Sequence, residues 1–301
     1  MKARMWIGVM AMFVMPLAFA QQQDLSKVVI ESQKLGEGLY MLSGAGGNIG
    51  ASVGEDGIVI IDDQFQELSP RIQEALAKLS PKPVRFVINT HWHFDHVGGN
   101  ENFAKAGAVI LAHGNVRRRM STTQLMKMFN REMPPSPQDA LPVVTFDSDV
   151  TLHYNGEELY VFHVNNAHTD GDSLILFRKA NVLHTGDTLF NGFYPFIDAD
   201  SGGSIDGMIA AADKVLGMVN EQTKLIPGHG PLATPNDLKA FRNMLVKLRE
   251  NVVKLIREGK TLEQTIAAVP TKDLDPEWGD GFLKPEQVVQ MVYTDLKRTE
   301  K

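Results

Sequence analysis

The chain has 301 residues, 43% hydrophobic and 22% charged, which suffices for one large domain or two small ones and argues against global disorder. The formal net charge of −6 argues against a nucleic-acid partner, because such a partner would need a basic face. The chain has no cysteine, which excludes disulfides, a lipid-anchoring cysteine and thiolate metal ligands.

Residues 1–20 have the pattern of a secretory signal peptide. Lys2 and Arg4 form a short positive region, residues 5–17 are apolar, and Ala-Phe-Ala precedes Gln21. The apolar run is short for a membrane anchor, which is the alternative interpretation. We therefore expect cleavage after Ala20 and a periplasmic or secreted protein with a net charge of about −8. No membrane contact is expected after cleavage.

The first half of the chain alternates apolar runs with helical patterns. Residues 69–79 begin with Ser-Pro, which predicts a helix with Ser69 as its N-cap. Further helices are predicted over 100–106 and 115–129, and strands over 28–32, 38–43, 48–54, 57–62, 84–89 and 108–112. Residues 120–142 are rich in methionine and proline, which is typical of a functional lid or a floppy insertion.

The second half repeats the alternation and ends in helices. Strands are predicted over 150–153, 157–165, 173–177, 181–184 and 224–226, with a helix over 204–216. A long helix follows Thr234, a capping box at Thr261 starts the next, and Pro285 starts the last. This order predicts an α/β fold, a four-layer αβ/βα sandwich over 21–232, with a helical extension over 233–301 packed on the same domain.

The densest group of metal-ligand residue types lies in residues 90–100. His91, His93, Asp95 and His96 fall within six consecutive positions, directly after the strand predicted over 84–89. Imidazole and carboxylate together are the ligand set of zinc and its neighbours. Taken alone, the cluster fits a surface loop or a structural metal clip equally well.

Three later fragments change this interpretation. His168, Asp187 and His229 each follow a predicted strand and are flanked by glycine or turn residues. In a sandwich of this kind the strand ends converge on one edge, so these side chains should meet the first cluster.

The fragments, in this order, resemble the metallo-β-lactamase superfamily over about residues 39–230. The resemblance implies seven metal ligands in two sets: His91, His93 and His168 at one metal, Asp95, His96 and His229 at the other, and Asp187 bridging both. The implied cofactor is two zinc ions per chain, with iron or manganese as alternatives. The implied reaction is attack by a metal-bridging hydroxide on a polarised carbonyl, with Asp95 orienting the hydroxide or carrying a proton.

Three further residues are expected to support the ligands from outside: Asp62, Asp172 and His184. Asp62 matches the superfamily's strand-end aspartate and would fix a ligand imidazole or the loop backbone, with a turn cap as the alternative.

The substrate pocket is expected to use aromatic residues that follow Asp187, namely Phe190, Tyr194 and Phe196. The alternative is that these rings pack under the sheet. Trp278 and Phe282 in the C-terminal extension are expected to anchor that extension, and the alternative is that they cap the site.

The bridging carboxylate makes the metal site similar to the glyoxalase II, phosphodiesterase and lactonase type. We expect an exported zinc-dependent hydrolase of an acyl bond (ester, lactone, thioester or amide), with weak β-lactamase activity as a further option. The alternative is a non-hydrolytic protein of the same fold, such as a mononuclear iron sulfur-compound dioxygenase or a periplasmic redox-relay component. The expected partner is a small-molecule substrate, and the sequence assigns no oligomeric state.

Overall fold

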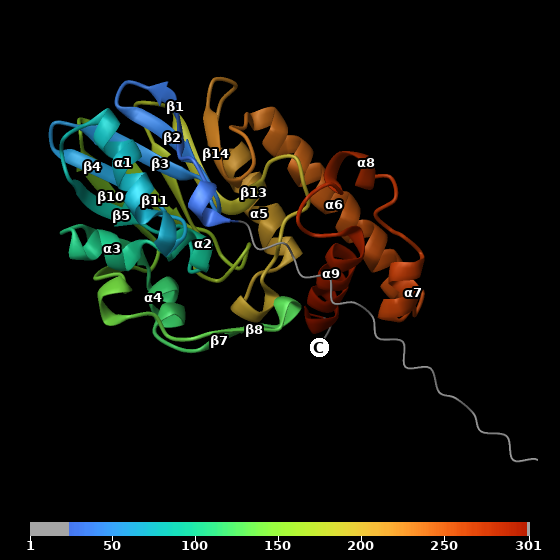
Figure 1. Cartoon of the computed structure of the whole chain (residues 1–301). Coiled ribbons are helices and arrows are strands. Elements are labelled where there is room, and N and C mark those ends of the chain that lie inside the picture. Colours follow the sequence, from blue (N-terminus) through green and yellow to red (C-terminus); the bar gives the residue numbers. More distant parts are fainter. Residues whose placement is uncertain (1–23, 300–301) are drawn as a thin grey trace, which may run out of the picture.

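The computed structural model describes residues 24–299, which form two β-sheets packed face to face with helices outside them (Figure 1). The expected signal peptide lies outside the described residues. Between residues 24 and 299, no helix is long and apolar enough to cross a membrane.

The first sheet has seven strands in the order β1-β2-β3-β4-β5-β6-β9. Strands β1 to β4 pair antiparallel, whereas β4, β5, β6 and β9 pair parallel. The helices α1 (Ser69–Leu79) and α3 (Asn100–Lys105) lie in the crossovers that parallel pairing requires. The strands are β1 (Glu31–Gly36), β2 (Leu39–Ser43), β3 (Ile49–Gly54), β4 (Gly57–Ile61), β5 (Val84–Ile88), β6 (Val109–His113) and β9 (Val144–Phe146).

The second sheet has five strands in the order β10-β11-β12-β13-β14. All neighbours are antiparallel except β13 and β14, which are parallel and connected through α5 (Ile205–Leu216). The strands are β10 (Asp149–Tyr154), β11 (Glu157–His163), β12 (Ser173–Phe177), β13 (Val182–Phe190) and β14 (Lys224–His229).

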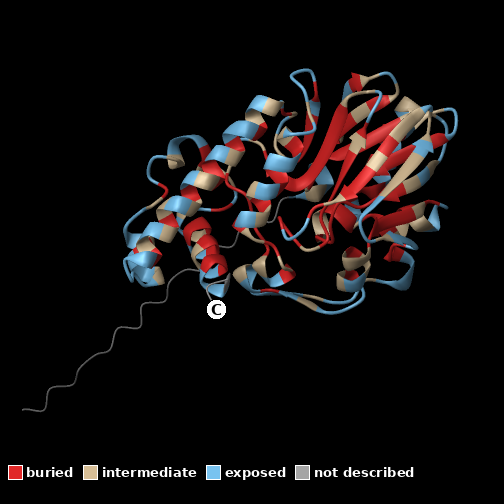
Figure 2. Cartoon of the chain, turned by 180° about the vertical axis from the view of Figure 1, so that it is seen from behind, coloured by how far each residue is buried: buried red, intermediate tan, exposed pale blue. Residues whose placement is uncertain are grey.

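The core between the sheets is made by apolar side chains of both, including the fully buried Val59, Ile88, Val161 and Ile175. A second cluster joins the first sheet to α1 and α3, and a third joins the second sheet to α5 and the later helices. Figure 2 shows buried residues along the strands and exposed residues on the outer faces of the helices. The predicted four-layer sandwich is confirmed.

The C-terminal helices pack on this sandwich beside α5. Helices start after Thr234 and Thr261 as predicted, with the predicted capping box at Thr261 and a second capping box at Thr234. Trp278 is buried against Phe241 of α6, with ring centroids 6.0 Å apart, and its carbonyl accepts from the backbone N–H of Tyr194 at 3.0 Å, so Trp278 anchors the extension to the sandwich. The helices are α6 (Pro235–Arg257), α7 (Leu262–Ala267), α8 (Asp275–Trp278) and α9 (Pro285–Thr299).

The helix predicted over 115–129 is wrong beyond Met120. The hydroxyls of Ser121 and Thr122 donate to carbonyls of the last turn of α4, at 2.6 and 3.2 Å, and compete with helix continuation. The chain instead forms a hairpin apart from both sheets, along the lower edge of Figure 1. We call residues 124–133 the strap, which consists of β7 (Gln124–Met126), η3 (Lys127–Phe129) and β8 (Arg131–Met133), after α4 (Gly114–Met120).

Two other boundaries differ from the predictions. The first strand begins at Glu31, not at residue 28. Leu68, not Ser69, is the N-cap of α1, and the buried Ser69 hydroxyl has no hydrogen-bond partner in the described part of the chain.

Candidate metal centre

The expected ligands come from strand ends of both sheets and meet at one edge of the sandwich. The short helix α2 (Phe94–Val97) follows β5 closely, His168 lies between β11 and β12, and His229 ends β14. Asp187 lies inside β13, which continues well past the strand predicted over 181–184. Gly186 before it has φ 51°, and a Cβ there would lie 2.7 Å from Cβ of Thr90, so this approach requires glycine.

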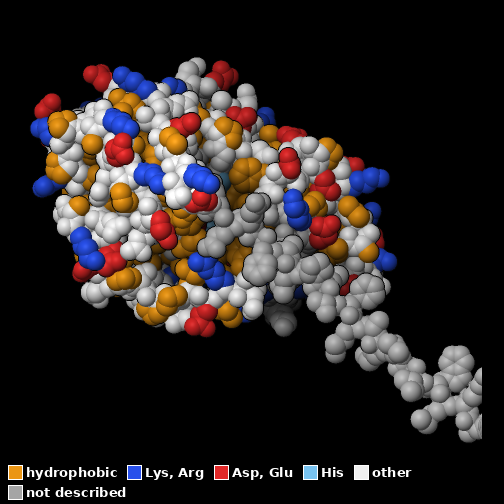
Figure 3. Space-filling view, in the orientation of Figure 1, with side chains coloured by type: hydrophobic (Ala, Val, Ile, Leu, Met, Phe, Trp, Pro, Cys, Tyr) orange, Lys and Arg blue, Asp and Glu red, His pale blue; other side chains and the backbone are white. Residues whose placement is uncertain are grey.

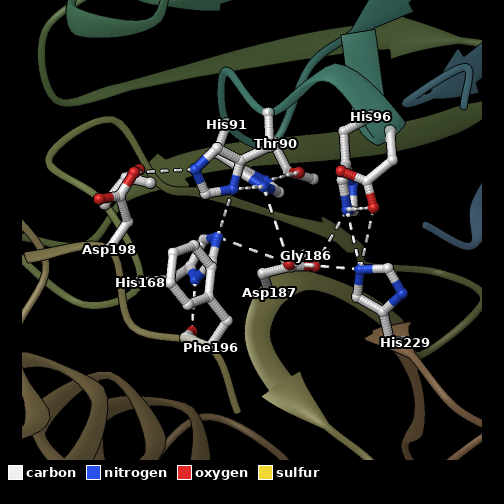
Figure 4. Close-up of polar contacts among 12 residues, drawn as sticks. Thr90, His91, His96, His168, Gly186, Asp187, Phe196, Asp198 and His229 are labelled. Carbon is white, nitrogen blue, oxygen red and sulfur yellow. Dashed lines mark hydrogen bonds and ion pairs between the residues drawn. The ribbon is translucent and has the colours of Figure 1, made fainter. Parts of the chain in front are cut away.

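The first donor group is His91, His93 and His168, together with Asp187. Nδ1 of His93 lies 3.1 Å from Nε2 of His91 and 2.8 Å from Nε2 of His168. The imidazoles of this group are buried, and its donor atoms all lie within 4.8 Å of one another. Figure 4 shows His91 and His168 pointing toward Asp187.

The second donor group is Asp95, His96 and His229. Nε2 of His229 lies 3.3 Å from Nε2 of His96 and 3.4 Å from Oδ2 of Asp95. Asp187 lies between the two groups, with Oδ2 3.5 Å from Nε2 of His168 and Oδ1 3.1 Å from Nε2 of His96. The structure thus brings all seven predicted ligands together.

Each ligand imidazole has one ring nitrogen that points toward the donor group and one that points away from it. A hydrogen bond on the outward nitrogen fixes the ring proton there and leaves the lone pair on the inward nitrogen. Nε2 of His93 donates to Asp198 at 3.0 Å, and Nδ1 of His168 donates to the carbonyl of Phe196 at 2.7 Å. Nδ1 of His96 donates to Asp62 at 2.8 Å. With those protons outside, each neutral imidazole turns the lone pair of its inner nitrogen toward the site, as a metal ligand must.

His91 follows the same pattern through Thr90. The Thr90 hydroxyl donates to Oδ2 of Asp62 at 2.7 Å and therefore accepts from Nδ1 of His91, 3.0 Å away. Oδ1 of Asp187 is buried, and within residues 24–299 its one polar contact is the 3.1 Å approach of Nε2 of His96. The nitrogen lone pairs of these histidines and the oxygens of Asp187 face one another, and a cation between them would offset their repulsion. The residues present therefore suit the two metal positions.

The electrostatics of the first group keep His91 and His168 neutral. Burial lowers the pKa of His91 well below its usual range and that of His168 to about 4. Burial would raise the pKa of Asp198, but the hydrogen bond and charge of His93 bring it to about 2. Asp198 is therefore a permanent anion that orients the His93 ring.

The second group behaves differently because carboxylates surround it. Burial alone would lower the pKa of His96, but Asp187, Asp95 and Asp62 outweigh burial and raise that pKa well above its usual range. For Asp187, burial is outweighed by the neighbouring histidines, which hold its pKa well below its usual range. Without metal this group holds a proton on imidazole, and cation binding would release it.

The expected supporting residues lie where they can position the ligands. Buried Asp62 has φ 63°, accepts from the backbone N–H of Thr90 at 2.7 Å and contacts His96, so it holds both loop and ligand. Asp172 accepts from the backbone N–H groups of His168 and Thr169 at 2.7 and 2.9 Å, and burial raises its pKa to about 7.

His184 acts through backbone groups. Its Nε2 donates to the carbonyl of Asn48 at 3.0 Å, and its Nδ1 accepts from the N–H of Gly186 at 3.2 Å. The Asn48 amide in turn donates to the carbonyls of Pro227 and Gly230, each at 2.9 Å, on either side of His229. Sequence reasoning missed both Asn48 and Asp198, because no spacing links them to the ligands.

A cavity of about 630 Å³ opens above the donor groups. Phe190 and Phe196 line it, as predicted. Tyr194 does not: it is buried away from the cavity and donates to Asp275 at 2.9 Å. The prediction for Tyr194 is corrected, because a buried hydroxyl needs an acceptor and finds one in the C-terminal extension.

Residues 49–236 match the family model of the metallo-beta-lactamase superfamily, which is more than half of the chain. The chain belongs to this superfamily. Its two His/Asp donor groups are arranged as groups that can hold metal ions.

Individual relatives are distant. The chain is 28% identical over 109 residues to a hydroxyacylglutathione hydrolase of Pelagibacter ubique, covering 36% of this chain and 37% of the relative. It is 28% identical over 146 residues to the 2,4-dinitroanisole O-demethylase subunit alpha of a Nocardioides species, covering 46% of this chain and 40% of that relative. It is 26% identical over 202 residues to a metallo-beta-lactamase type 2 of Elizabethkingia meningoseptica, covering 64% of this chain and 74% of that relative.

Solved structures show the same fold at low identity. A metallo-beta-lactamase from Pontibacter korlensis superposes with a TM-score of 0.60 at 17% identity, covering 72% of this chain and 98% of its own. The sec-alkylsulfatase Pisa1 from a Pseudomonas species superposes with a TM-score of 0.65 at 19% identity, covering 88% of this chain and 50% of its own.

Proposed function

We propose that the chain is a dinuclear zinc hydrolase of an acyl bond: an ester, lactone, thioester or amide. The observation that carries the proposal is the place of Asp187, whose two oxygens face His168 of one donor group and His96 of the other. Two neighbouring cations repel each other, and an anion between them offsets that repulsion. The same position favours a dinuclear site over the mononuclear iron alternative.

The donor chemistry supports zinc. Three imidazoles and the Asp187 carboxylate, with no thiolate, are ligands that zinc takes in catalytic sites, where its coordination can expand to a fifth ligand. Asp95 makes the second group richer in oxygen, which suits zinc and also iron or manganese. Two bound divalent cations would polarise the scissile carbonyl and bring the pKa of a water nucleophile toward neutrality.

The chain's own residues supply positioning and proton transfer. The Asp95 carboxylate is 19% exposed, with Oδ2 3.4 Å from Nε2 of His229 and 3.8 Å from Nε2 of His96. It therefore faces both the second donor group and the cavity, and we assign it the acceptance of the water proton and its delivery to the leaving group.

A hydrolysis panel on zinc-loaded protein tests the proposal. β-Lactam, lactone, thioester and phosphodiester compounds are assayed with the wild type and with Asp187→Ala. We expect cleavage of at least one acyl compound by the wild type, with on the order of a 10³-fold loss in the variant because the two cations lose their shared anion. Oxygen consumption with a persulfide, without hydrolysis of any panel member, would contradict it.

We further propose that the protein is exported and acts on a small molecule. The N-terminal pattern of residues 1–20 supports export. The cavity volume of about 630 Å³ is in the range of small-molecule sites. In the view of Figure 3, charged side chains of both signs are interspersed, unlike the basic face that a nucleic acid requires. N-terminal sequencing of protein from the periplasmic fraction should begin at Gln21, and a mature protein that retains Met1 in the cytoplasm would refute export.

A further inference from the structure

The cavity above the donor groups has one basic side chain in an aromatic surrounding. Seven phenylalanines line it, and among the described residues at its wall Arg131 is the only lysine or arginine. The Arg131 guanidinium carbon lies 4.2 Å from the ring centroid of Phe94, which holds it by a cation–π contact. No carboxylate of residues 24–299 forms an ion pair with it.

The strap directs Arg131 into the cavity by its strand pairing. Met126 pairs with Arg131 across the hairpin, so the two side chains share one face, and both line the cavity. Leu125 and Glu132, one position away on each strand, project from the opposite face. The turn between the strands places Phe129 against Phe196, with ring centroids 5.0 Å apart.

The remaining aromatic wall lies at the second donor group. Phe190 stacks on His229, with centroids 5.2 Å apart, and contacts Phe193 at 5.8 Å. A substrate between these walls therefore meets rings on both sides of the donor groups, which suits an apolar or aromatic body.

The charge distribution around the cavity favours Arg131 as the partner of an anionic group. Asp95 and Asp187 offset half of the charge of two divalent ions, and the buried Asp62 and Asp198 behind the ligand imidazoles offset more of it. Asp280, an exposed acidic residue of the C-terminal extension that lines the cavity, would repel an anion from that side. Arg131 is the cation that the described cavity wall offers to an anionic group.

On the basis of the proposed hydrolase function, we propose that Arg131 is a specificity-determining residue that binds a carboxylate of the substrate. The substrate class is an acyl compound with an apolar, aromatic-sized body and one carboxylate away from the scissile bond. The guanidinium donates two parallel hydrogen bonds to that carboxylate, and the phenylalanine walls contact the apolar body.

A matched substrate pair tests this on the zinc-loaded enzyme. One compound is a 4-nitrophenyl ester whose acyl chain ends in a carboxylate, and the other carries a primary amide instead. We expect kcat/KM of the wild type to favour the carboxylate at least tenfold, mainly through KM. Arg131→Gln should remove this preference by lowering kcat/KM for the carboxylate compound at least tenfold more than for the amide compound, and Arg131→Lys should restore part of the preference. Glu132→Gln, on the outer face, is the matched control and should keep it.

Two outcomes would overturn the proposal. One is a wild-type ratio of kcat/KM between the carboxylate and the amide compound near one, and the other is an equal loss of kcat/KM for both compounds in Arg131→Gln. A binding measurement separates this from failure of the hydrolase function. Calorimetric titration with 4-biphenylacetate and its amide should show at least tenfold tighter binding of the carboxylate by the wild type only, even if neither ester is cleaved. Equal carboxylate affinity of wild type and Arg131→Gln would show that the metals alone hold the anion and would also overturn the proposal.

Discussion

The floor of the cavity consists of the metal-ligand residues, and its walls consist of the lining phenylalanines and Arg131. The two parts are held in place in opposite ways. On the floor, each of four ligand imidazoles is buried and its outer nitrogen is fixed by a second hydrogen bond, to Thr90, Asp198, Asp62 or the carbonyl of Phe196. On the walls, Phe129 and Phe282 are 40% and 56% exposed. The floor comes from sheet edges, whereas these wall residues come from the strap and the C-terminal extension.

The strap also differs from the floor in how it is attached. Its two strands pair only with each other, and an exposed ion pair of Lys127 with Asp200 joins its turn to the loop that carries Asp198. Surface pairs of this kind contribute little free energy. We infer that the sheets fix the positions of the metal-ligand residues. Substrate choice would then depend on the strap and the C-terminal extension, which can change without moving those residues.

Removing the support of a floor ligand should have the largest effect. Asp198→Ala leaves Nε2 of His93 without its acceptor, so ring orientation and tautomer are no longer fixed. We expect zinc affinity and hydrolytic activity to fall by about 10- to 100-fold. Competition with a chelating dye measures the affinity. Asp206→Asn, which breaks an exposed pair with Arg249, is the control, and equal affinities of the two variants would contradict the assigned role of Asp198.

The floor should also show a characteristic pH dependence of stability through Asp63. Burial raises the pKa of Asp63 well above its usual range, and its Oδ2 has no hydrogen-bond partner in the described part of the chain. Between the unfolded pKa of about 3.9 and the folded pKa, only the unfolded state is ionised, so stability falls as pH rises. Below about pH 4 both states hold the proton and the dependence ends.

Asp63→Asn removes this titration. As pH rises, the unfolding free energy of the wild type should therefore fall relative to that of the variant, by up to about 1.4 kcal/mol per pH unit. Urea unfolding of both proteins at pH 5 and pH 7, in chelator, measures the shift. Parallel stability changes over this interval would show that Asp63 is ionised in the folded protein.

A wall substitution should leave the metals in place. Phe129→Ala removes the ring that packs on Phe196, and aromatic pairs contribute about 0.5–1.5 kcal/mol. We expect KM for aryl substrates to rise by roughly three- to tenfold, with zinc content unchanged. Leu125→Ala, on the outer face of the strap, should behave as the wild type. Loss of zinc in Phe129→Ala would contradict the separation of walls from floor.

The smallest effect is expected where the strap is tied down. Lys127→Met removes the 2.5 Å contact between Nζ and Asp200, at a cost of less than about 1 kcal/mol because the pair is exposed. Limited proteolysis within residues 121–142 should accelerate by no more than about fivefold. Lys78→Met, which breaks an exposed pair on α1, controls for lost charge. Unchanged cleavage in Lys127→Met would show that the ion pair does not hold the strap.

The sequence predicted the floor better than the walls for a physical reason. His91, His93, Asp95 and His96 share one short loop, so their spacing alone restricts where their side chains can meet. Asp187 could be predicted because β13 carries it to the same sheet edge, although that strand is longer than expected.

The missed residues obey no such restriction. Asp198 contacts His93 across 105 positions, from a loop without periodicity. Tyr194 and Phe196 lie in the same irregular loop, where the sequence has no periodicity that predicts side-chain direction. Tyr194 donates to Asp275, whereas Phe196 lines the cavity. Residues 124–129 of the strap were predicted as the end of a helix, whereas the hydroxyls of Ser121 and Thr122 end that helix at Met120.

The most direct test of the dinuclear site is anomalous diffraction from zinc-soaked crystals on both sides of the zinc edge. The structure predicts two zinc peaks per chain: one among His91, His93 and His168, and one among Asp95, His96 and His229, with Asp187 between them. A single peak per chain at full occupancy, or peaks away from these side chains, would contradict the dinuclear assignment.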